Sequence, residues 1–266
     1  MRAKINGFDM NYEISGKEGA PPIVLHHPLA TDLTIWDELT AALEPKYRVI
    51  RMDARGHGKS EATPAPYDMF NLAKDVVGLM DHLGIAKSRY LGLSMGGFVG
   101  QVLGITHPER FHSLVLVSTS SDLTAAAPIW ESRIQIAQKE GMSQQIVDGS
   151  MQRWVAPDKL ASAPALVKRL GAMVAGTSVA GFTGWCQAIQ KFNITSRLKE
   201  IDLPVRIVAG AIDPATTPAM MQIMHKEIKG SEYGEVPGTA HMLHVEEPAM
   251  FHAAVLPFID AHGPKA

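Results

Sequence analysis

The chain begins with short apolar runs separated by longer amphipathic segments. Four runs are apolar enough for buried strands, at residues 21–27, 47–53, 88–94 and 113–119. Three segments between them have the apolar spacing of helices, at residues 32–43, 70–84 and 95–107. Residues 1–15 alternate around Asn6-Gly7, which predicts a β-hairpin ahead of these elements. The alternation of strands and helices favours a mostly parallel sheet with helices on both faces.

The alternation of strands and helices stops at residue 120 and resumes near residue 196. The intervening stretch predicts successive helices and carries three of the four tryptophans, Trp130, Trp154 and Trp185. Beyond it we expect strands at 204–210 and 232–236 and helices at 217–228 and 248–262. The complete prediction is an α/β fold with an eight-stranded sheet. Residues 1–119 and 196–266 form its two parts, and residues 120–195 form a helical lid inserted after the sixth strand.

Composition narrows the class of protein. Apolar residues make up 46% and charged residues 20% of the 266 positions, which is typical of a globular domain. The formal net charge is -2 and there is no dense run of Lys or Arg, so neither nucleic acid nor an anionic membrane is an expected partner. There is a single cysteine, Cys186, which we expect in the core, so no internal disulfide can form. The N-terminal segment does not resemble a leader. Both features favour a reducing, cytoplasmic setting.

A serine stands between two glycines where a predicted strand passes into a predicted helix. The segment Gly92-Leu93-Ser94-Met95-Gly96 matches G-x-S-x-G, a sharp turn that lifts the serine hydroxyl above the carboxyl edge of a sheet. Glycines two residues to either side avoid a clash across this turn. The Met95 N–H, at the start of the helix, is aimed at developing negative charge. We therefore expect Ser94 to be a nucleophile.

A serine nucleophile needs a base, and the base needs an acid that orients it. In this architecture the order along the chain is serine, acid, histidine, each in a loop after a strand. Asp213 follows the penultimate predicted strand and His241 follows the last, so with Ser94 they form the expected catalytic triad. His244 is the rival base, and Asp122 is the rival acid.

A second donor to the oxyanion is expected from the loop after the first buried strand. This loop contains His27-Pro28-Leu29, and the Leu29 N–H is expected to point into the site beside the Met95 N–H. Removing one such donor typically costs about 10²–10³ in rate.

Two other motifs predict less. The segment Gly58-Lys59-Ser60 ends like a phosphate-binding loop, but Asp53 stands where the first glycine of that motif belongs. Phosphate binding is therefore not expected. The pairs His26-His27 and His241-x-x-His244 have no accompanying carboxylate cluster, so no metal site is expected.

These residues together resemble the α/β-hydrolase superfamily along the whole chain. The matching segments are LHHPLATDLTIW, RMDARGHGKS, GLSMGGFVGQ, VAGAIDPATTP and GTAHMLHVEEP. Within it the chain is most similar to the 3-oxoadipate enol-lactonases of aromatic-acid degradation, in segments such as YDMFNLAKDVVGLMDHLGI, HPERFHSLVLVSTS and CQAIQKFNITSRLKEIDLPVRIVAG. One segment departs, because those lactonases usually read Ser-Asn-Ser-Leu-Gly where residues 26–30 here read His-His-Pro-Leu-Ala.

The resemblance implies a serine hydrolase that opens a small lactone or ester, with 3-oxoadipate enol-lactone as the favoured substrate and with no cofactor. The same triad also suits a carboxylesterase or a hydrolase of carbon–carbon bonds, and a non-catalytic ligand receptor on this scaffold is a further alternative. The expected oligomeric state is a monomer or a homodimer.

Specificity is expected to lie in the predicted lid. A substrate carboxylate should meet a lid cation, and the candidates are Arg133, Arg153 and Lys191. Trp130, Trp154 and Trp185 are candidate walls of an apolar pocket, and His27 places an imidazole beside the oxyanion loop. For each of these residues the alternative is a plain packing or surface role.

Overall fold

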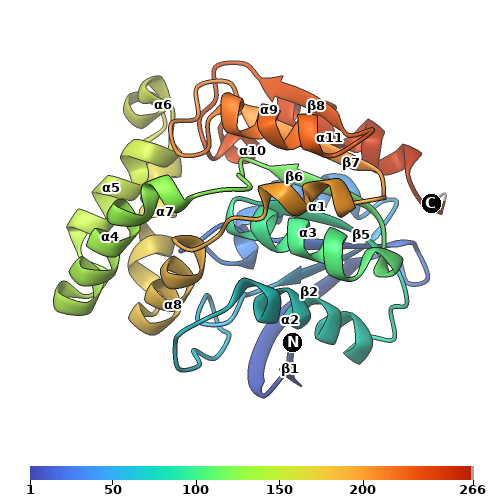
Figure 1. Ribbon diagram of the computed structural model, residues 1–266, viewed down its shortest axis with the longest axis horizontal. Helices are drawn as coiled ribbons and strands as arrows, with labels where there is room; N and C mark the ends of the chain where they lie inside the picture. Colours follow the sequence, from blue (N-terminus) through green and yellow to red (C-terminus); the bar gives the residue numbers. More distant parts are fainter. Residues whose placement is uncertain (265–266) are drawn as a thin grey trace.

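The computed structural model describes residues 1–264, which build one eight-stranded sheet flanked by helices (Figure 1). The strands are β1 (Arg2–Ile5), β2 (Phe8–Gly16), β3 (Pro22–His26), β4 (Arg48–Met52), β5 (Ser88–Leu93), β6 (Phe111–Val117), β7 (Val205–Gly210) and β8 (Glu232–Val236). Their order in the sheet is β1-β2-β4-β3-β5-β6-β7-β8. β1 and β2 pair antiparallel, as do β2 and β4, whereas β3 to β8 are parallel. The predicted mostly parallel sheet is confirmed.

The sheet begins with the predicted hairpin. Asn6 and Gly7 have φ values of 46° and 89°, the positive values that a two-residue hairpin turn requires. Ile5 and Phe8 face each other directly after it. The Asn6 side chain donates to the carboxylate of Asp75 on α2 (Met69–His82) at 3.0 Å, which fastens the hairpin to a helix.

Helices cover both faces of the sheet, as predicted. One face carries α2, α3 (Met95–Thr106) and α9 (Pro218–Glu227), and the other carries α1 (Asp37–Leu43) and α11 (Pro248–Ala261) (Figure 1). Short turns of helix are η1 (Leu33–Trp36), η2 (Pro108–Arg110) and α10 (Leu243–Glu246). The helix expected from residue 32 begins as the 3-10 turn η1, because the Asp32 side chain accepts the Thr34 N–H at 2.9 Å and tightens the first turn.

Between β6 and β7 the chain forms five helices, which we call the inserted helices. They are α4 (Ala127–Glu140), α5 (Gln144–Trp154), α6 (Pro157–Ser162), α7 (Pro164–Gly176) and α8 (Val179–Ile189). Short turns η3 (Thr124–Ala126) and η4 (Thr195–Glu200) lie at the two ends of this segment. In Figure 1 the inserted helices lie left of the sheet, beyond the carboxyl ends of the parallel strands. α4 packs along α8, and α5 packs along α7.

One inserted helix is fixed closely to the core. Gly181 at the start of α8 lies against Gly56, and a Cβ on Gly181 would stand 2.2 Å from the Gly56 carbonyl oxygen. Only two glycines allow so close a backbone approach. The Trp185 Nε1–H then donates to the Arg55 carbonyl at 3.0 Å.

Within residues 1–264, every helix is too short or too polar to cross a membrane.

Candidate active site

Ser94 occupies a strained turn at the carboxyl end of β5. Its φ of 52° and ψ of -108° are rare for a residue with a side chain, and such strain is often found at functional positions. Ser94 is the only residue between Ser88 and Gly104 that is not buried. The turn therefore exposes its side chain at the edge of an otherwise buried strand and helix.

Close backbone packing explains the glycines that flank this serine. A Cβ on Gly92 would stand 2.2 Å from the Gly96 carbonyl oxygen, and a Cβ on Gly96 would stand 2.3 Å from the His26 carbonyl oxygen. The Ser94 N–H donates to the Val117 carbonyl at 2.8 Å, which ties the turn to β6. Any larger residue at either glycine would push the turn away from its neighbours.

Asp213, in the loop after β7, and His241, in the loop after β8, contact each other through buried side chains. His241 Nδ1 lies 2.7 Å from Asp213 Oδ2, and both side chains are almost completely buried. The other partners of the carboxylate are the main-chain N–H groups of Ala215 and Thr216 and the Thr216 hydroxyl, at 2.7, 3.1 and 2.8 Å. Burial alone would raise the pKa of Asp213, but the charge and hydrogen bond of His241 and the donors of residues 215 and 216 outweigh it. Its pKa is therefore lowered.

The loop that carries His241 crosses the carboxyl edge of the sheet. It starts after β8, passes so close over the end of β7 that a Cβ on Gly210 would meet the Ala240 carbonyl oxygen at 1.9 Å, and reaches η1 beyond β3. There the His244 ring lies 4.7 Å from the Trp36 ring, centroid to centroid. In the sheet order, β5 and β6 lie between these two points. The path of this loop from β7 toward β3 therefore follows the edge at which β5 ends and Ser94 lies.

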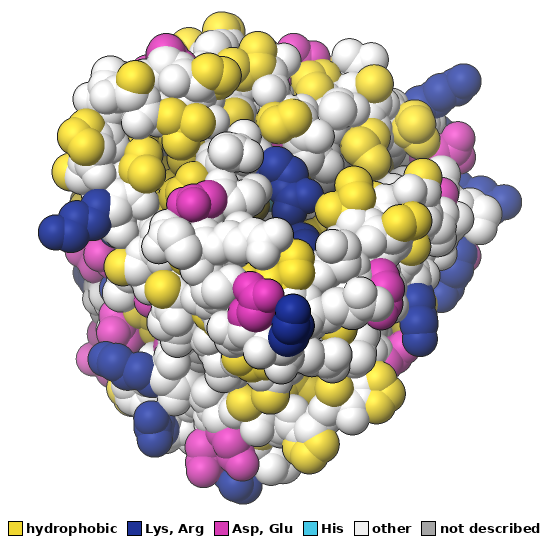
Figure 2. Space-filling view, turned by 90° about the vertical axis from the view of Figure 1, so that its left-hand side faces the viewer, with side chains coloured by type: hydrophobic (Ala, Val, Ile, Leu, Met, Phe, Trp, Pro, Cys, Tyr) yellow, Lys and Arg dark blue, Asp and Glu magenta, His cyan; other side chains and the backbone are white. Residues whose placement is uncertain are grey.

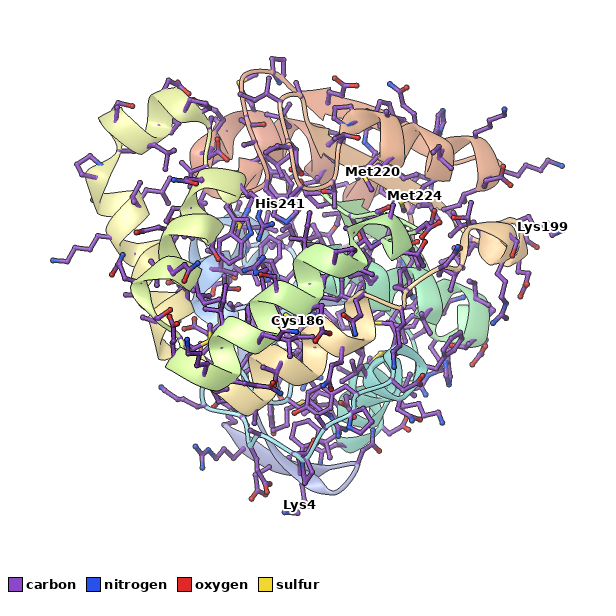
Figure 3. The ribbon with its side chains drawn as sticks, turned by 60° about the vertical axis from the view of Figure 1, so that its left-hand side comes forward. Lys4, Cys186, Lys199, Met220, Met224 and His241 are labelled. Atoms are coloured by element: carbon purple, nitrogen blue, oxygen red, sulfur yellow. The ribbon has the colours of Figure 1, made fainter. Side chains whose placement is uncertain are left out.

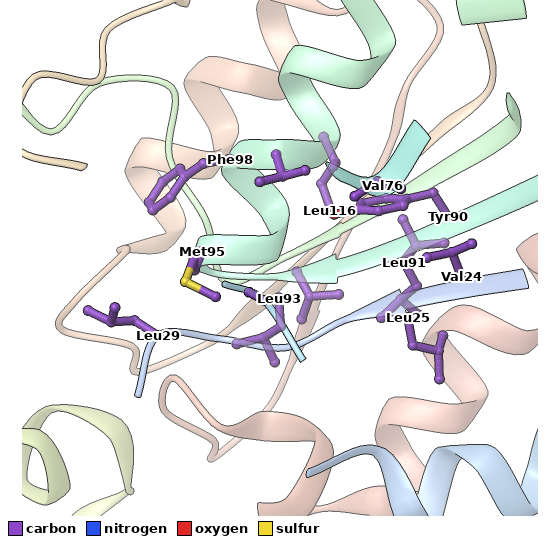
Figure 4. Close-up of a cluster of buried hydrophobic side chains, with 14 of the residues drawn as sticks. Val24, Leu25, Leu29, Val76, Tyr90, Leu91, Leu93, Met95, Phe98 and Leu116 are labelled. Carbon is purple, nitrogen blue, oxygen red and sulfur yellow. The ribbon is translucent and has the colours of Figure 1, made fainter. Parts of the chain in front are cut away.

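The two expected oxyanion donors lie at this same edge. Figure 4 shows Leu29 after β3 and Met95 after β5 at one end of the central strands. Within residues 1–264, neither the Leu29 N–H nor the Met95 N–H donates to a protein acceptor. Met95 opens α3, where the first N–H groups of a helix have no partner inside the helix. Both donors are thus available to a ligand oxygen.

The rival acid and base occupy other environments. His244 is buried against Trp36, and within residues 1–264 no carboxylate is bonded to its ring. Burial, with the charges of Arg169 and His241, lowers the pKa of His244 to about 3. Asp122 accepts from Thr124 and Asn193 in the connectors of the inserted helices. The geometry therefore favours Asp213 and His241 over both rivals.

Two arginines of the inserted helices are withdrawn from solvent, Arg133 almost fully and Arg153 in part. Arg133 on α4 is only 8% exposed, its Nη2 donates to the Ser150 hydroxyl at 3.0 Å, and it packs over the rings of Trp130 and Phe182. Burial, and then the charge of Arg153 on α5, lower the pKa of Arg133 to about 10. Within residues 1–264, no carboxylate forms a salt bridge with either arginine.

Figure 2 views the molecule from the side of the inserted helices. Near the middle of this face, Lys or Arg side-chain atoms lie recessed in a hollow among apolar and uncharged atoms. Lys191 in contrast is exposed in the turn after α8. Of the three predicted lid cations, Arg133 is therefore buried, Arg153 is half-buried and Lys191 is exposed.

The remaining predicted contacts link the inserted helices to the sheet. Trp154 is buried at the end of α5, and its carbonyl accepts the Met242 N–H at 3.0 Å, directly after His241. Trp130 is half-buried beside Arg133.

Figure 3 shows His241 between the inserted helices and the sheet, with Cys186 on α8. Burial raises the pKa of the Cys186 thiol to about 12, so the predicted core role of this cysteine is confirmed.

Three residues of the site were not predicted. Thr216 donates to Asp213, Glu246 accepts the Ala240 N–H at 3.2 Å and so holds the loop of His241, and His57 bonds the oxyanion loop. Asp213 precedes a proline in a turn, a position at which an aspartate side chain often accepts the main-chain N–H two residues on, as it does here from Ala215. No sequence signal marked Glu246 or His57.

A family model described as the alpha/beta hydrolase fold matches residues 21–248, and the chain belongs to this family. It is 34% identical to 3-oxoadipate enol-lactonase 2 of Acinetobacter baylyi, over 92% of this chain and 91% of that protein. It is 30% identical to 3-oxoadipate enol-lactonase 1 of the same organism, over 92% and 91%. An enol-lactonase structure from Burkholderia xenovorans matches with 33% identity and a TM-score of 0.92, over 97% of this chain and 99% of that one. The chain is thus an enzyme of the α/β-hydrolase class.

Proposed function

We propose that this chain is a serine hydrolase that opens a small lactone or ester, and that 3-oxoadipate enol-lactone is its preferred substrate. One observation carries the proposal: the strained, partly exposed Ser94 stands at the carboxyl edge of the sheet, where the loops after β7 and β8 bring Asp213 and His241 into contact. The similarity to enol-lactonases over more than nine-tenths of the chain supports a lactone as the substrate.

The chemistry follows from the roles of these groups. The Ser94 hydroxyl oxygen adds to the lactone carbonyl carbon while His241 Nε2 takes its proton, and the carbonyl electrons move onto the oxygen. Leu29 and Met95 N–H groups hold this oxyanion. When the intermediate collapses, the ring C–O bond breaks and His241 protonates the leaving enol oxygen. His241 then removes a proton from water, which adds to the acyl carbon. When this second intermediate collapses, the bond between the acyl carbon and the Ser94 oxygen breaks, His241 returns the proton to that oxygen, and the acid is released.

Asp213 orients His241 and stabilises the imidazolium that forms at each proton transfer. Its lowered pKa keeps the carboxylate ionised wherever the enzyme works near neutral pH. The four donors around it fix its position, so the His241 ring is held with Nδ1 toward the carboxylate and Nε2 free for Ser94 or the leaving group.

We place the recognition of the substrate in the inserted helices, as a lid over the sheet edge. Arg133 and Arg153 are assigned to the substrate carboxylate, because a buried cation without a counter-ion costs several kcal/mol that an anion bound beside it offsets. Trp130 is assigned to the wall of this subsite, and Trp154 to holding the lid on the His241 loop. Lys191 receives no substrate contact, since it is exposed.

The test is a substrate panel with a covalent probe. We expect ring opening of 3-oxoadipate enol-lactone to exceed hydrolysis of saturated lactones, p-nitrophenyl esters and vinylogous diketones, and a fluorophosphonate to label Ser94. Faster turnover of the simple esters would assign the chain to the carboxylesterases, and faster turnover of the diketones to the carbon–carbon bond hydrolases. A burst without turnover would indicate a ligand receptor instead.

A further inference from the structure

Two imidazoles outside the triad join the loop after β3 to the loop after β4. His57 Nε2 accepts the Ala30 N–H at 2.9 Å, and His27 Nε2 accepts the Ala54 N–H at 2.9 Å. Each ring is carried by one loop and accepts a main-chain N–H from the other. The two ring centroids are 5.3 Å apart, and both side chains are buried. The connection between the loops is therefore reciprocal.

These contacts determine the protonation of both rings. A main-chain N–H only donates, so both Nε2 atoms must be unprotonated acceptors. Each neutral ring then carries its proton on Nδ1. His27 Nδ1 lies 2.8 Å from the Pro28 carbonyl oxygen, and His57 Nδ1 lies 3.3 Å from the Arg55 carbonyl oxygen. All four ring nitrogens are engaged with the main chain, which leaves none for a substrate.

The groups that the rings hold are the two peptide units around Leu29. The Pro28 carbonyl, which accepts from His27 and from the Thr31 hydroxyl, belongs to the same planar peptide as the Leu29 N–H. Holding the carbonyl at one end of a trans peptide fixes the N–H at the other end in the opposite direction. His57 holds the next peptide through the Ala30 N–H.

This stretch of chain needs such support because its backbone is unfavourable. Ala30 has φ of 56°, in the left-handed region that a residue with a Cβ rarely adopts. A loop that relaxed toward an ordinary φ at Ala30 would turn the Leu29–Ala30 peptide, whose N–H His57 holds, relative to the next peptide. The contacts of His57 and His27 oppose that rotation directly.

We propose that His27 and His57 form an imidazole brace, a pair of positioning residues that aims the Leu29 N–H at the oxyanion. This inference rests on the proposed function, in which Leu29 supplies one of the two oxyanion donors. The brace holds only while both rings are neutral, because an imidazolium presents an N–H toward the N–H it should accept.

The surroundings keep both rings neutral near pH 7. Burial lowers the pKa of His27, against the charges of Asp53 and Asp32, and burial together with the neighbouring imidazoles lowers the pKa of His57. Trp185 from α8 packs edge-on against the His57 ring and adds apolar cover. The titratable groups that face the two rings are Asp32, Asp53 and His26.

Kinetics of two substitutions at one position test the brace. His57→Leu removes the acceptor, and His57→Gln supplies a side-chain oxygen for the Ala30 N–H. We expect His57→Leu to lower kcat about 10- to 100-fold with KM unchanged, since a misaimed donor loses part of the 10²–10³ that a deleted donor typically costs. His57→Gln should recover most of this loss, and His112→Leu, at the amino end of β6, is the control. Equal losses in the Leu and Gln variants, or a change in KM alone, would overturn the proposal.

Nitrogen NMR of the histidine-labelled wild-type chain is the second measurement, and it stays decisive if His57→Leu fails to fold. Both rings should be Nδ1–H tautomers at pH 7 and should stay neutral at pH 5. A proton on Nε2 of either ring at pH 7 would overturn the brace. This measurement needs no substrate, so a chain that hydrolyses nothing would refute the proposed function and leave the outcome for the brace separate.

Discussion

Asp213 and Arg133 are both buried and both charged, but the protein treats them differently. The Asp213 carboxylate accepts four hydrogen bonds, one of them from the ring it pairs with. The Arg133 guanidinium, within residues 1–264, makes one side-chain hydrogen bond, to a neutral hydroxyl, and has no carboxylate beside it. The partners of the Asp213 carboxylate thus lie within the chain, whereas the Arg133 guanidinium lacks a counter-charge, which in the proposed function the substrate supplies.

The largest expected effect is at the serine. Ser94→Ala should lower kcat about 10⁴-fold or more and abolish labelling by a fluorophosphonate, because no other group can form the acyl-enzyme. Ser196→Ala, at an exposed position of η4, is the matched control and should change neither. Retention of the hydrolytic rate by Ser94→Ala would place the chemistry elsewhere.

The next largest expected effect is at Asp213, whose carboxylate accepts four hydrogen bonds. Asp213→Asn should lower kcat about 10⁴-fold, because an amide favours the wrong tautomer of His241. Since the pKa of Asp213 lies below its ordinary value of 3.8, the wild type should lose no activity through this group until the pH falls below that value. Asp122→Asn is the control. If the two substitutions had similar small effects on kcat, Asp213 would have no special role.

The third expected effect is on the pH dependence of stability, and it arises at His244. His244 titrates near pH 6.5 when unfolded and near 3 when folded. Below pH 6.5 the unfolded chain therefore takes up a proton that the folded chain does not, and stability falls as the pH falls. His244→Phe should remove about 2 kcal/mol of the stability lost between pH 7 and pH 5, as measured by urea unfolding. An unchanged loss in the variant would mean that His244 is already protonated in the folded chain.

The smallest effect is at the arginines. Arg153→Met should raise KM for an anionic lactone about 10-fold, equivalent to about 1.4 kcal/mol, and leave KM for a neutral ester unchanged. Arg133→Met should act in the same direction, and Lys191→Met, which removes an exposed cation, should not. Parallel changes for the anionic and neutral substrates would mean that these side chains support packing only.

Local patterns in the sequence predicted the features that depend on few residues. The Asn6-Gly7 hairpin and the glycine-flanked turn at Ser94 follow from backbone conformations that neighbouring residues decide by themselves. The order of the loops after parallel strands also predicted which acid and which imidazole meet, because strand order sets what lies at one edge.

Features that depend on packing between distant segments could not be predicted from the sequence. Arg133 and Lys191 look alike as lid cations, yet α4 packing on α8 buries the first and leaves the second exposed. The bond between His57 and Ala30 requires β3 and β4 to be neighbours and the His57 imidazole to be neutral. A periodic pattern reports which face of an element is buried, but not which polar group it meets there.

Arg133 and Arg153 lie on different pairs of the inserted helices. Arg133 belongs to the α4–α8 pair, which the Gly56–Gly181 contact fastens to the core, and Arg153 belongs to the α5–α7 pair. Their like charges repel across the junction of the two pairs, and an anion held between them attracts both. In the proposed subsite, the affinity for an anion would therefore depend on how closely the two pairs are held together. The connecting residues 141–143 and 177–178 join one pair to the other, so their lengths would affect that affinity.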